Sequence, residues 1–133
     1  MWLVTRLAPA GTFSFSGQLL LASMLLLAAG LVGLASVGHF RRAGTTVNPL
    51  SPERASRLVS GGVYCLSRNP MYLALLLALL AWGAWLGNAI ALLVVPVFVY
   101  SMDRLQIAPE ERALEALFGE AYMAYRRKVR RWL

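Results

Sequence analysis

The chain contains a long apolar stretch, Met71–Met102, with a glycine-asparagine pair, Gly87-Asn88, near its middle. One continuous helix of this length would measure ~48 Å, which is too long for a hydrocarbon core of ~30 Å unless it is strongly tilted. A turn at the glycine-asparagine pair resolves the mismatch, because both residue types favour tight turns. The sequence therefore predicts a helical hairpin in lipid, with legs at about 71–87 and 88–102.

A dense polar motif stands at each end of this stretch. The sequence GGVYCLSRNPMY occupies positions 61–72, and DRLQIAPEER occupies positions 103–112. Because a hairpin returns the chain to the membrane face from which it started, both motifs are expected to meet at that face. A hairpin that joins an arginine-asparagine pair to a pair of glutamates is more typical of a site than of an anchor.

The composition is that of a basic membrane protein with one domain over residues 1–133. Hydrophobic residues make up 59% of the chain and charged residues 14%, and the net charge is +7. The arginines flank apolar segments and form no stripe on a polar face, which argues against nucleic acid as a partner. A single cysteine, Cys65, and a single histidine, His39, exclude an internal disulfide and a multi-cysteine or histidine-rich metal centre.

A first membrane span is predicted at about residues 18–38, which carry no charge and are long enough to cross the bilayer. HFRR follows at positions 39–42 in place of a small-residue cleavage site, which argues against a secretory signal peptide. Pro9 and Gly11 interrupt residues 1–16, so no helix is expected there. With the hairpin, this span predicts an all-α integral membrane helical bundle of about three transmembrane helices.

The positions of the arginines predict the orientation in the membrane. They are concentrated in the loop before the hairpin and in the tail after it, whereas the hairpin tip has no charge. The positive-inside rule places loop and tail in the cytoplasm and the tip outside. We therefore expect an integral protein of the inner or cytoplasmic membrane whose site faces the cytoplasm.

The tail, at about residues 110–131, is predicted to form an amphipathic helix, because apolar residues recur there at steps of three and four. Such a helix can lie in the headgroup region and close over the mouth of the hairpin. Its basic cluster, Arg126–Arg131, is expected to contact anionic membrane lipid. A short helix with Ser51 as its N-cap and Pro52 at its first position, and a kink at Pro96, are also expected.

Each polar motif can be explained on its own as a helix start. Asn69-Pro70 is a common N-cap and first position, and Glu110-Glu111 after Pro109 complements the positive end of a helix. The functional alternative is that the first start binds a carboxylate or phosphate, while the two carboxylates orient a cationic or hydroxyl-rich ligand. The predicted hairpin favours the functional interpretation, because it brings the two motifs together.

The remaining candidates are ambiguous in the same way. The pair Gly61-Gly62 either forms a simple turn or lets the backbone approach a ligand closely. The tyrosines near the motifs either anchor the protein at the interface or stack on a flat ring. Cys65 and His39 are assigned no chemistry.

Several segments from Phe40 to the C-terminus share their order and spacing with a known family. They are GTTVNP at positions 44–49, LVSGGVY at 58–64, SRNPMY at 67–72, PEER at 109–112, FGEAY at 118–122, and the segment from Tyr125 to Trp132. In these segments the chain resembles the isoprenylcysteine carboxyl methyltransferase and phospholipid methyltransferase family of integral-membrane enzymes, which use S-adenosylmethionine.

The resemblance implies a cofactor pocket between the cytoplasmic ends of the last two spans and the tail helix. It assigns catalytic roles to Arg68 and Glu111. It assigns S-adenosylmethionine binding to Gly62, Tyr64, Asn69, Pro70, Tyr72, Glu110 and Glu111. The family comparison further implies a lipophilic small molecule or lipid as methyl acceptor, which would enter laterally between helices.

The chain departs from the family pattern at two places. Asn69 stands where the prenylcysteine enzymes usually carry histidine, which leaves open whether prenylcysteine is the substrate. Family members also carry a further apolar span before the position of Met1, so the family pattern predicts one more span than this sequence contains.

The resemblance favours transfer of a methyl group from S-adenosylmethionine to a membrane-associated carboxylate, thiol or amine. Two alternatives remain at this point: an NADPH-dependent enzyme similar to membrane sterol reductases, and a non-catalytic membrane adaptor whose tail binds anionic lipid. The sequence identifies neither the acceptor nor the oligomeric state.

Overall fold

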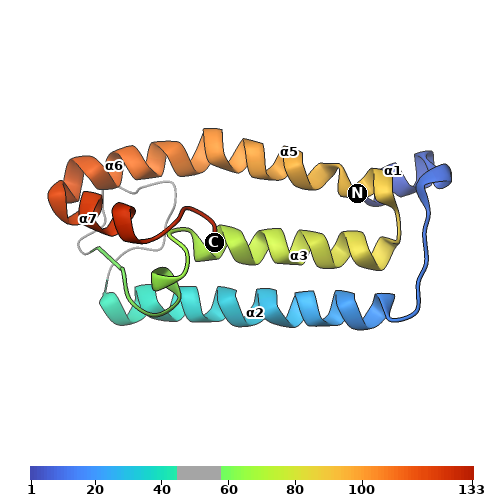
Figure 1. The fold of residues 1–133 in the computed structure, drawn as a ribbon, viewed down its shortest axis with the longest axis horizontal. Coiled ribbons are helices and arrows are strands. Elements are labelled where there is room, and N and C mark those ends of the chain that lie inside the picture. Colours follow the sequence, from blue (N-terminus) through green and yellow to red (C-terminus); the bar gives the residue numbers. More distant parts are fainter. Residues whose placement is uncertain (45–57) are drawn as a thin grey trace.

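The computed structural model describes residues 1–44 and 58–133, which form an elongated bundle of helices (Figure 1). Its described residues contain no strand, only an isolated bridge between Thr12 and Asn88, so the all-α prediction is confirmed. The helix expected from Ser51 lies outside the described residues. The helical elements are α1 (Trp2–Leu7), η1 (Pro9–Gly11), α2 (Gln18–Ala43), η3 (Gly62–Cys65), α3 (Pro70–Leu86), α4 (Ala89–Leu92), α5 (Val94–Ser101), η4 (Met102–Ile107), α6 (Ala108–Phe118) and α7 (Glu120–Lys128).

Helix α2 runs the length of the molecule and is longer than the predicted span of 18–38. It continues to Ala43 because Gly44, with φ 63°, caps it in the left-handed conformation and donates to carbonyls of the last turn. Arg41 and Arg42 therefore lie in its final turn, where positive charge complements the helix dipole.

The hairpin turn forms where the sequence predicts it. Helix α3 ends at Leu86, and Gly87 turns the chain with φ 59° while its N–H donates to the carbonyl of Gly83. A side chain at position 87 would meet the carbonyl oxygen of Phe13 at 2.5 Å, so only glycine fits. At the same end Gln18 Nε2 donates to the carbonyl of Ala84 over 2.9 Å and joins the start of α2 to the end of α3.

The second leg is longer than predicted. Instead of ending near residue 102, it runs from Ala89 through α5, η4 and α6 to Phe118. It is interrupted at Leu93, as expected of Pro96, whose missing N–H cannot donate to the carbonyl of Leu92. The segment η4 is a π-helix, whose backbone hydrogen bonds span five residues where those of an α-helix span four.

Two runs, α2 and the second leg, are long and apolar enough to cross a membrane, where the sequence predicted three. The predicted third span, α3, has 17 residues, as predicted, and is shorter than these two runs because Pro70 and Gly87 fix its two ends. It lies between α2 and the second leg (Figure 1) and buries small residues such as Ala74, Ala81 and Ala84.

The outer faces of the bundle are apolar. Large side chains such as Leu27 on α2, Trp82 on α3 and Val97 on α5 are more than half exposed. An exposed apolar surface of this extent is typical of a contact with membrane or with another protein. The long apolar helices and their exposed faces agree with a membrane environment.

The two ends of the chain differ from the predictions. Residues 1–16 are not free of helix: Trp2–Leu7 forms α1, which ends before Pro9, and Pro9–Gly11 forms the short turn η1. The tail is not one helix over 110–131, because it breaks at Gly119, with φ 49° and ψ −123°. Helix α7 consequently folds back and directs the C-terminus toward the start of α3 (Figure 1).

Asn88 secures the hairpin turn and is fully buried. Its Nδ2 donates to the carbonyl of Ala8 over 2.9 Å, and its Oδ1 accepts from the N–H of Ala91 as the cap of α4. The N–H of Phe13 donates to the carbonyl of Gly87 beside it, so the N-terminal segment is fastened to the turn.

We predict that Asn88→Leu lowers the free energy of unfolding by ~1–3 kcal/mol, because it leaves buried polar backbone groups without partners. Thermal unfolding in detergent measures the change. Thr12→Ala, which removes an exposed hydrogen bond to Pro9 at the same end, is the control. Equal stability of the two variants would contradict the role given to Asn88.

Candidate functional site

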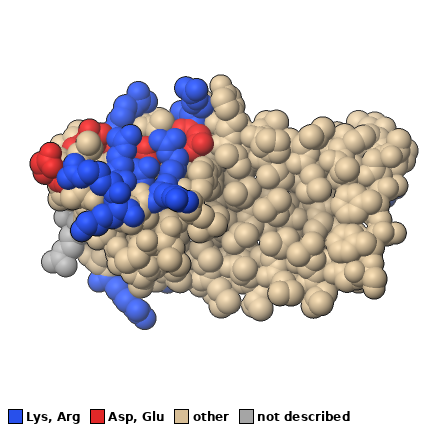
Figure 2. All heavy atoms as spheres, viewed as in Figure 1, with Lys and Arg blue, Asp and Glu red and all other residues tan. Residues whose placement is uncertain are grey.

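Most of the charged side chains visible in Figure 2 gather at one end of the bundle, around α6 and α7, and the long middle of the visible surface is uncharged. The loop after α2, the start of α3 and the folded-back tail all reach this end (Figure 1). The hairpin therefore brings the two polar motifs to the same end, as the sequence predicted.

Glu111 on α6 is the centre of this end, and it is 6% exposed. Its Oε1 lies 3.0 Å from Nη1 of Arg68, and its Oε2 lies 2.6 Å from Nη2 of Arg131. Nε of Arg131 also donates to Oε1 over 3.2 Å, so this guanidinium binds the carboxylate with two bonds. The predicted convergence of Arg68 and Glu111 is an ion pair, and Arg131 completes it.

The chain beyond α7 lies across the start of α3. The N–H of Arg68 donates to the carbonyl of Arg130 over 2.9 Å. Ser67 Oγ and Asn69 Nδ2 both donate to the carbonyl of Arg131, over 3.2 and 3.0 Å. Trp132 Nε1 donates to Asp103 on η4 over 3.2 Å, which fixes the far side of the segment.

Asn69 is the N-cap residue of α3, and Pro70 takes the first helical position, both as predicted. The side chain of Asn69, however, makes no capping hydrogen bond, and its Nδ2 donates to the tail instead. Ser67 Oγ instead accepts from the N–H of Asn69 over 3.1 Å. Pro70 is almost fully buried and sets the direction in which α3 leaves the site.

Glu110 occupies a different environment from Glu111. Its Oε1 accepts from the hydroxyl of Tyr72 on α3 and from Nε2 of Gln106, the latter over 2.8 Å. Both donors are neutral, whereas Glu111 is bound by two guanidiniums. The adjacent carboxylates thus face different partners and can bind different parts of a ligand.

The π-helix η4 makes this arrangement possible. It precedes Pro109, which has no N–H for a regular helical bond, and the wider turn carries both Asp103 and Gln106 to the site. Asp103 also lies 3.5 Å from Nη1 of Arg131. Isolated π-turns are common at functional sites, and this one supplies two site contacts.

Tyr64 on η3 is 5% exposed and packs edge-on against Phe40 at the end of α2. Tyr125 on α7 donates its hydroxyl to the carbonyl of Tyr64 over 2.6 Å. Burial raises the pKa of the Tyr125 phenol, so this hydroxyl stays protonated and acts as a donor. These contacts fasten the loop before α3 to both α2 and α7.

Gly62 is required by a neighbour in the protein. It has φ 59°, and a side chain there would lie 1.4 Å from Nε2 of His39. The close approach that the glycine pair permits is therefore to this imidazole. The structure thus gives a packing role to His39, to which the sequence assigned none.

Tyr122 on α7 is 1% exposed and accepts a hydrogen bond from Nη1 of Arg68 over 3.3 Å. Burial raises the pKa of its phenol, with the carboxylate of Glu111 acting in the same direction. The neutral hydroxyl therefore orients Arg68 toward Glu111 and adds no charge to the site.

The predicted site residues divide into two groups. The structure joins Arg68, Asn69 and Glu111 through the tail, and joins Tyr72 to Glu110. Gly62, Tyr64 and Pro70 shape the loop and the helix start instead. Sequence reasoning missed four contributors: Ser67, Asp103, Gln106 and Arg131. Three of them lie inside the quoted polar motifs, whereas Arg131 was treated as one of several lipid-facing cations.

The arrangement offers paired donors and acceptors to a ligand. Arg68 Nε is buried and has no hydrogen-bond partner among the described residues. Asn69, Ser67 and Arg68 supply donors for an anionic group, and the two glutamates supply acceptors for a cationic one. Within residues 1–44 and 58–133, no three His, Cys, Asp or Glu side chains gather as a metal site would require.

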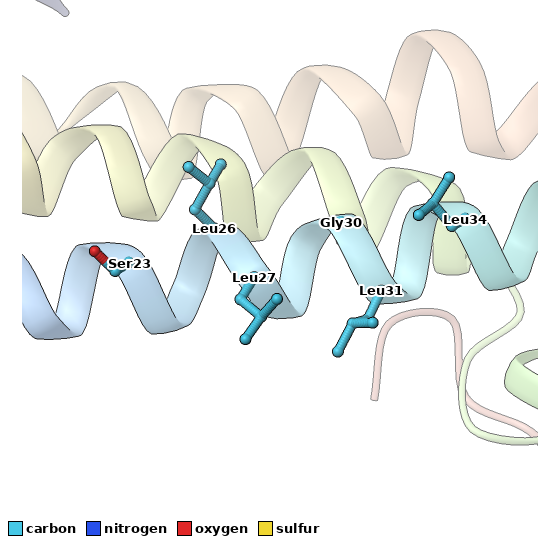
Figure 3. A pocket seen from close by; sticks show the side chains of 6 residues that line it. All are labelled: Ser23, Leu26, Leu27, Gly30, Leu31 and Leu34. Carbon is cyan, nitrogen blue, oxygen red and sulfur yellow. The ribbon is translucent and has the colours of Figure 1, made fainter.

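A shallow apolar groove lies elsewhere, on the middle of α2 (Figure 3). Leucines make up most of its walls, with Gly30 at its floor and Ser23 at one end. It carries no ionisable group and lies on the apolar part of the bundle. We therefore assign the site to the charged end.

Comparison with known proteins agrees with the sequence resemblance. A family described as phospholipid methyltransferase matches residues 17–121. A Haemophilus influenzae protein described only as uncharacterized is 56% identical over 63 residues, which are 47% of this chain and 100% of that protein. The Protein-S-isoprenylcysteine O-methyltransferase of Schizosaccharomyces pombe is 32% identical over 72 residues, which are 54% of this chain and 30% of that protein. No solved structure matches the chain.

We predict that Glu111→Gln destabilises the protein by ~3–5 kcal/mol, because removing the buried carboxylate takes from Arg68 its counter-charge and leaves Arg131 only that of Asp103. Thermal unfolding in detergent is the measurement. The control is Glu120→Gln, whose carboxylate is exposed and lies 3.6 Å from Arg127, and which should change stability little. Similar effects of both changes would contradict a central role for Glu111.

We also predict that Gly62→Ala destabilises by roughly 1–3 kcal/mol or more, through backbone strain and the clash with His39. Gly61→Ala is a matched control, because a side chain there meets nothing within 4 Å. Adding His39→Ala to Gly62→Ala should restore the steric part of the loss in a denaturation experiment. No restoration would show that the imidazole contact is unimportant.

Proposed function

This chain belongs to the phospholipid methyltransferase family, and on that premise we propose that it transfers a methyl group from S-adenosylmethionine to a lipophilic acceptor in the membrane. The observation that carries the proposal is the convergence of Arg68 and Glu111 across the hairpin at the charged end of an apolar bundle. An anchor or adaptor does not need a buried ion pair in this place.

The residues at the charged end fit the cofactor. S-adenosylmethionine supplies an electrophilic methyl group on a sulfonium, together with an amino-acid end and an adenosine. Nε of Arg68 is buried and has no hydrogen-bond partner within the described part of the chain, so it can donate to a carboxylate, and Asn69 supplies an amide donor beside it. Glu110 and Glu111 can accept from an ammonium or a ribose hydroxyl.

Tyr72 and Glu110 are placed to orient the reacting groups. The Tyr72 hydroxyl fixes the Glu110 carboxylate from α3, while Gln106 fixes it from η4. Both residues lie at the junction between the charged end and the apolar helices. Methyl transfer is an in-line displacement, and holding donor and acceptor in alignment can supply ~7–11 kcal/mol of the barrier. The protein then acts chiefly by placement and by excluding water.

The acceptor is proposed to be lipophilic because the surface that leads to the site is apolar. Exposed apolar side chains extend along α2, α3 and α5 away from the charged end. A lipid-soluble carboxylate, thiol or amine can approach through these faces without crossing water. The presence of Asn69 in place of histidine leaves the acceptor group open among these three.

The charged end is proposed to face the cytoplasm, in accord with the positive-inside rule. Exposed cations of α7, including Arg126 and Arg127, lie on this end and can contact anionic lipid headgroups. These contacts would seat the tail at the membrane surface beside the site.

Binding and transfer experiments test the proposal. Purified protein should bind S-adenosylmethionine and not NADPH, and membranes that contain it should transfer label from methyl-labelled cofactor to a lipid-soluble product. Glu110→Gln keeps the shape of the side chain and removes its charge, so we expect at least a tenfold loss of transfer with an unchanged unfolding temperature. Binding of NADPH alone, or full activity of this variant, would overturn the proposal.

A further inference from the structure

The five residues after α7, Val129–Leu133, form a strap that crosses the charged end. Helix α7 stops at Lys128, and the chain becomes extended at Val129, with φ −120° and ψ 133°. From there the strap runs to the start of α3 (Figure 1). Arg131 contacts the site in two ways: its carbonyl accepts hydrogen bonds at the start of α3, and its side chain binds Glu111.

The backbone carbonyls of the strap accept hydrogen bonds from donors at the start of α3. The carbonyl of Arg130 accepts from the N–H of Arg68, and the carbonyl of Arg131 accepts from Ser67 Oγ and Asn69 Nδ2. Three donors from consecutive residues thus converge on two carbonyl oxygens. An anionic group with two oxygens would satisfy the same donors.

The side chain of Arg131, in the strap, binds the carboxylate of Glu111 on α6. Arg131 binds Glu111 through Nε and Nη2, over 3.2 and 2.6 Å. Arg68 holds the same carboxylate over 3.0 Å, so Glu111 keeps one counter-charge even without the strap. The Arg131 contact is therefore the exchangeable one of the two. A compact cation would satisfy the same carboxylate.

The strap therefore presents carbonyl oxygens to the donors at the start of α3 and a cation to Glu111. An α-amino acid presents the same pair of groups, a carboxylate and an ammonium separated by one carbon. We propose that the strap occupies the subsite for the amino-acid end of S-adenosylmethionine, so that strap and cofactor compete for Ser67, Asn69 and Glu111. This inference rests on the proposed function and adds a self-inhibiting contact to it.

The strap can leave without unfolding the tail. The side chain of Arg131 is 33% exposed, whereas those of Arg68 and Glu111 are 9% exposed. Helix α7 is held independently, by Tyr125 on the carbonyl of Tyr64 and by Tyr122 against Arg68. Release of the strap thus breaks contacts at the chain end only, which are the least costly to open.

Competition of this kind weakens the apparent affinity for the cofactor. A ligand that binds only when the strap is released has an apparent dissociation constant equal to its intrinsic constant divided by the fraction of protein in which the strap is released. Weakening the strap should therefore tighten binding of ligands that carry the amino-acid end. Ligands that lack this end should bind as before.

The test compares two probes in the full-length protein. S-adenosylhomocysteine carries the amino-acid end, and 5′-methylthioadenosine lacks it. We expect Arg131→Ala to lower the dissociation constant of S-adenosylhomocysteine by ~3–10-fold and to leave that of 5′-methylthioadenosine unchanged. Arg131→Lys should give an intermediate value, because one bond to Glu111 can re-form. Arg127→Ala, on the exposed side of α7, is the control and should change neither.

A second measurement uses the unaltered protein. Saturating S-adenosylhomocysteine should speed removal of Leu133 and Trp132 by carboxypeptidase Y, followed by intact mass, while 5′-methylthioadenosine should not. The inference is overturned if Arg131→Ala weakens binding, if both probes respond alike, or if S-adenosylhomocysteine slows the trimming. Failure of the unaltered protein to bind either probe would instead overturn the proposed function.

Discussion

The buried carboxylate of Glu111 is the interaction on which the charged end depends. A carboxylate that is 6% exposed is costly unless it is paired and hydrogen-bonded. Here it is paired twice, by Arg68 from the start of α3 and by Arg131 from the end of the chain. Three segments that are distant in sequence therefore meet at one side chain. The same requirement brings the end of the tail back to the start of α3.

Glu110 and Glu111 show how neighbours on one helix can differ in function. Successive residues on an α-helix point in different directions, and η4 sets the rotation with which α6 begins. Glu111 consequently meets two cations, and Glu110 meets a phenol and an amide. The first carboxylate fastens three segments of the chain, and the second is held by neutral partners only.

The sequence predicted the elements whose causes are local. The turn at Gly87, the helix start at Pro70 and the meeting of Arg68 with Glu111 follow from turn chemistry, proline chemistry and hairpin topology. It did not predict the strap, because Arg131 resembles every other arginine of a basic tail until the break at Gly119 redirects it. Nor could it predict that Gly62 faces His39, since that contact joins elements whose spacing no local rule fixes. The second leg was predicted to end near residue 102 but continues to Phe118, because apolar composition marks a span without marking where its helix ends.

The π-helix η4 has a consequence for how this site can change over evolutionary time. A π-turn is equivalent to an α-helix that has gained one residue, and loss of one residue from positions 102–107 would return it to regular geometry. Everything beyond it would then rotate by about 100° relative to α5. Glu110 and Glu111 would swing away from Tyr72 and Arg68 without any substitution in the site. A single codon deletion could thus separate two halves of a site while leaving the apolar bundle intact, which makes chain length at this point as constrained as residue identity.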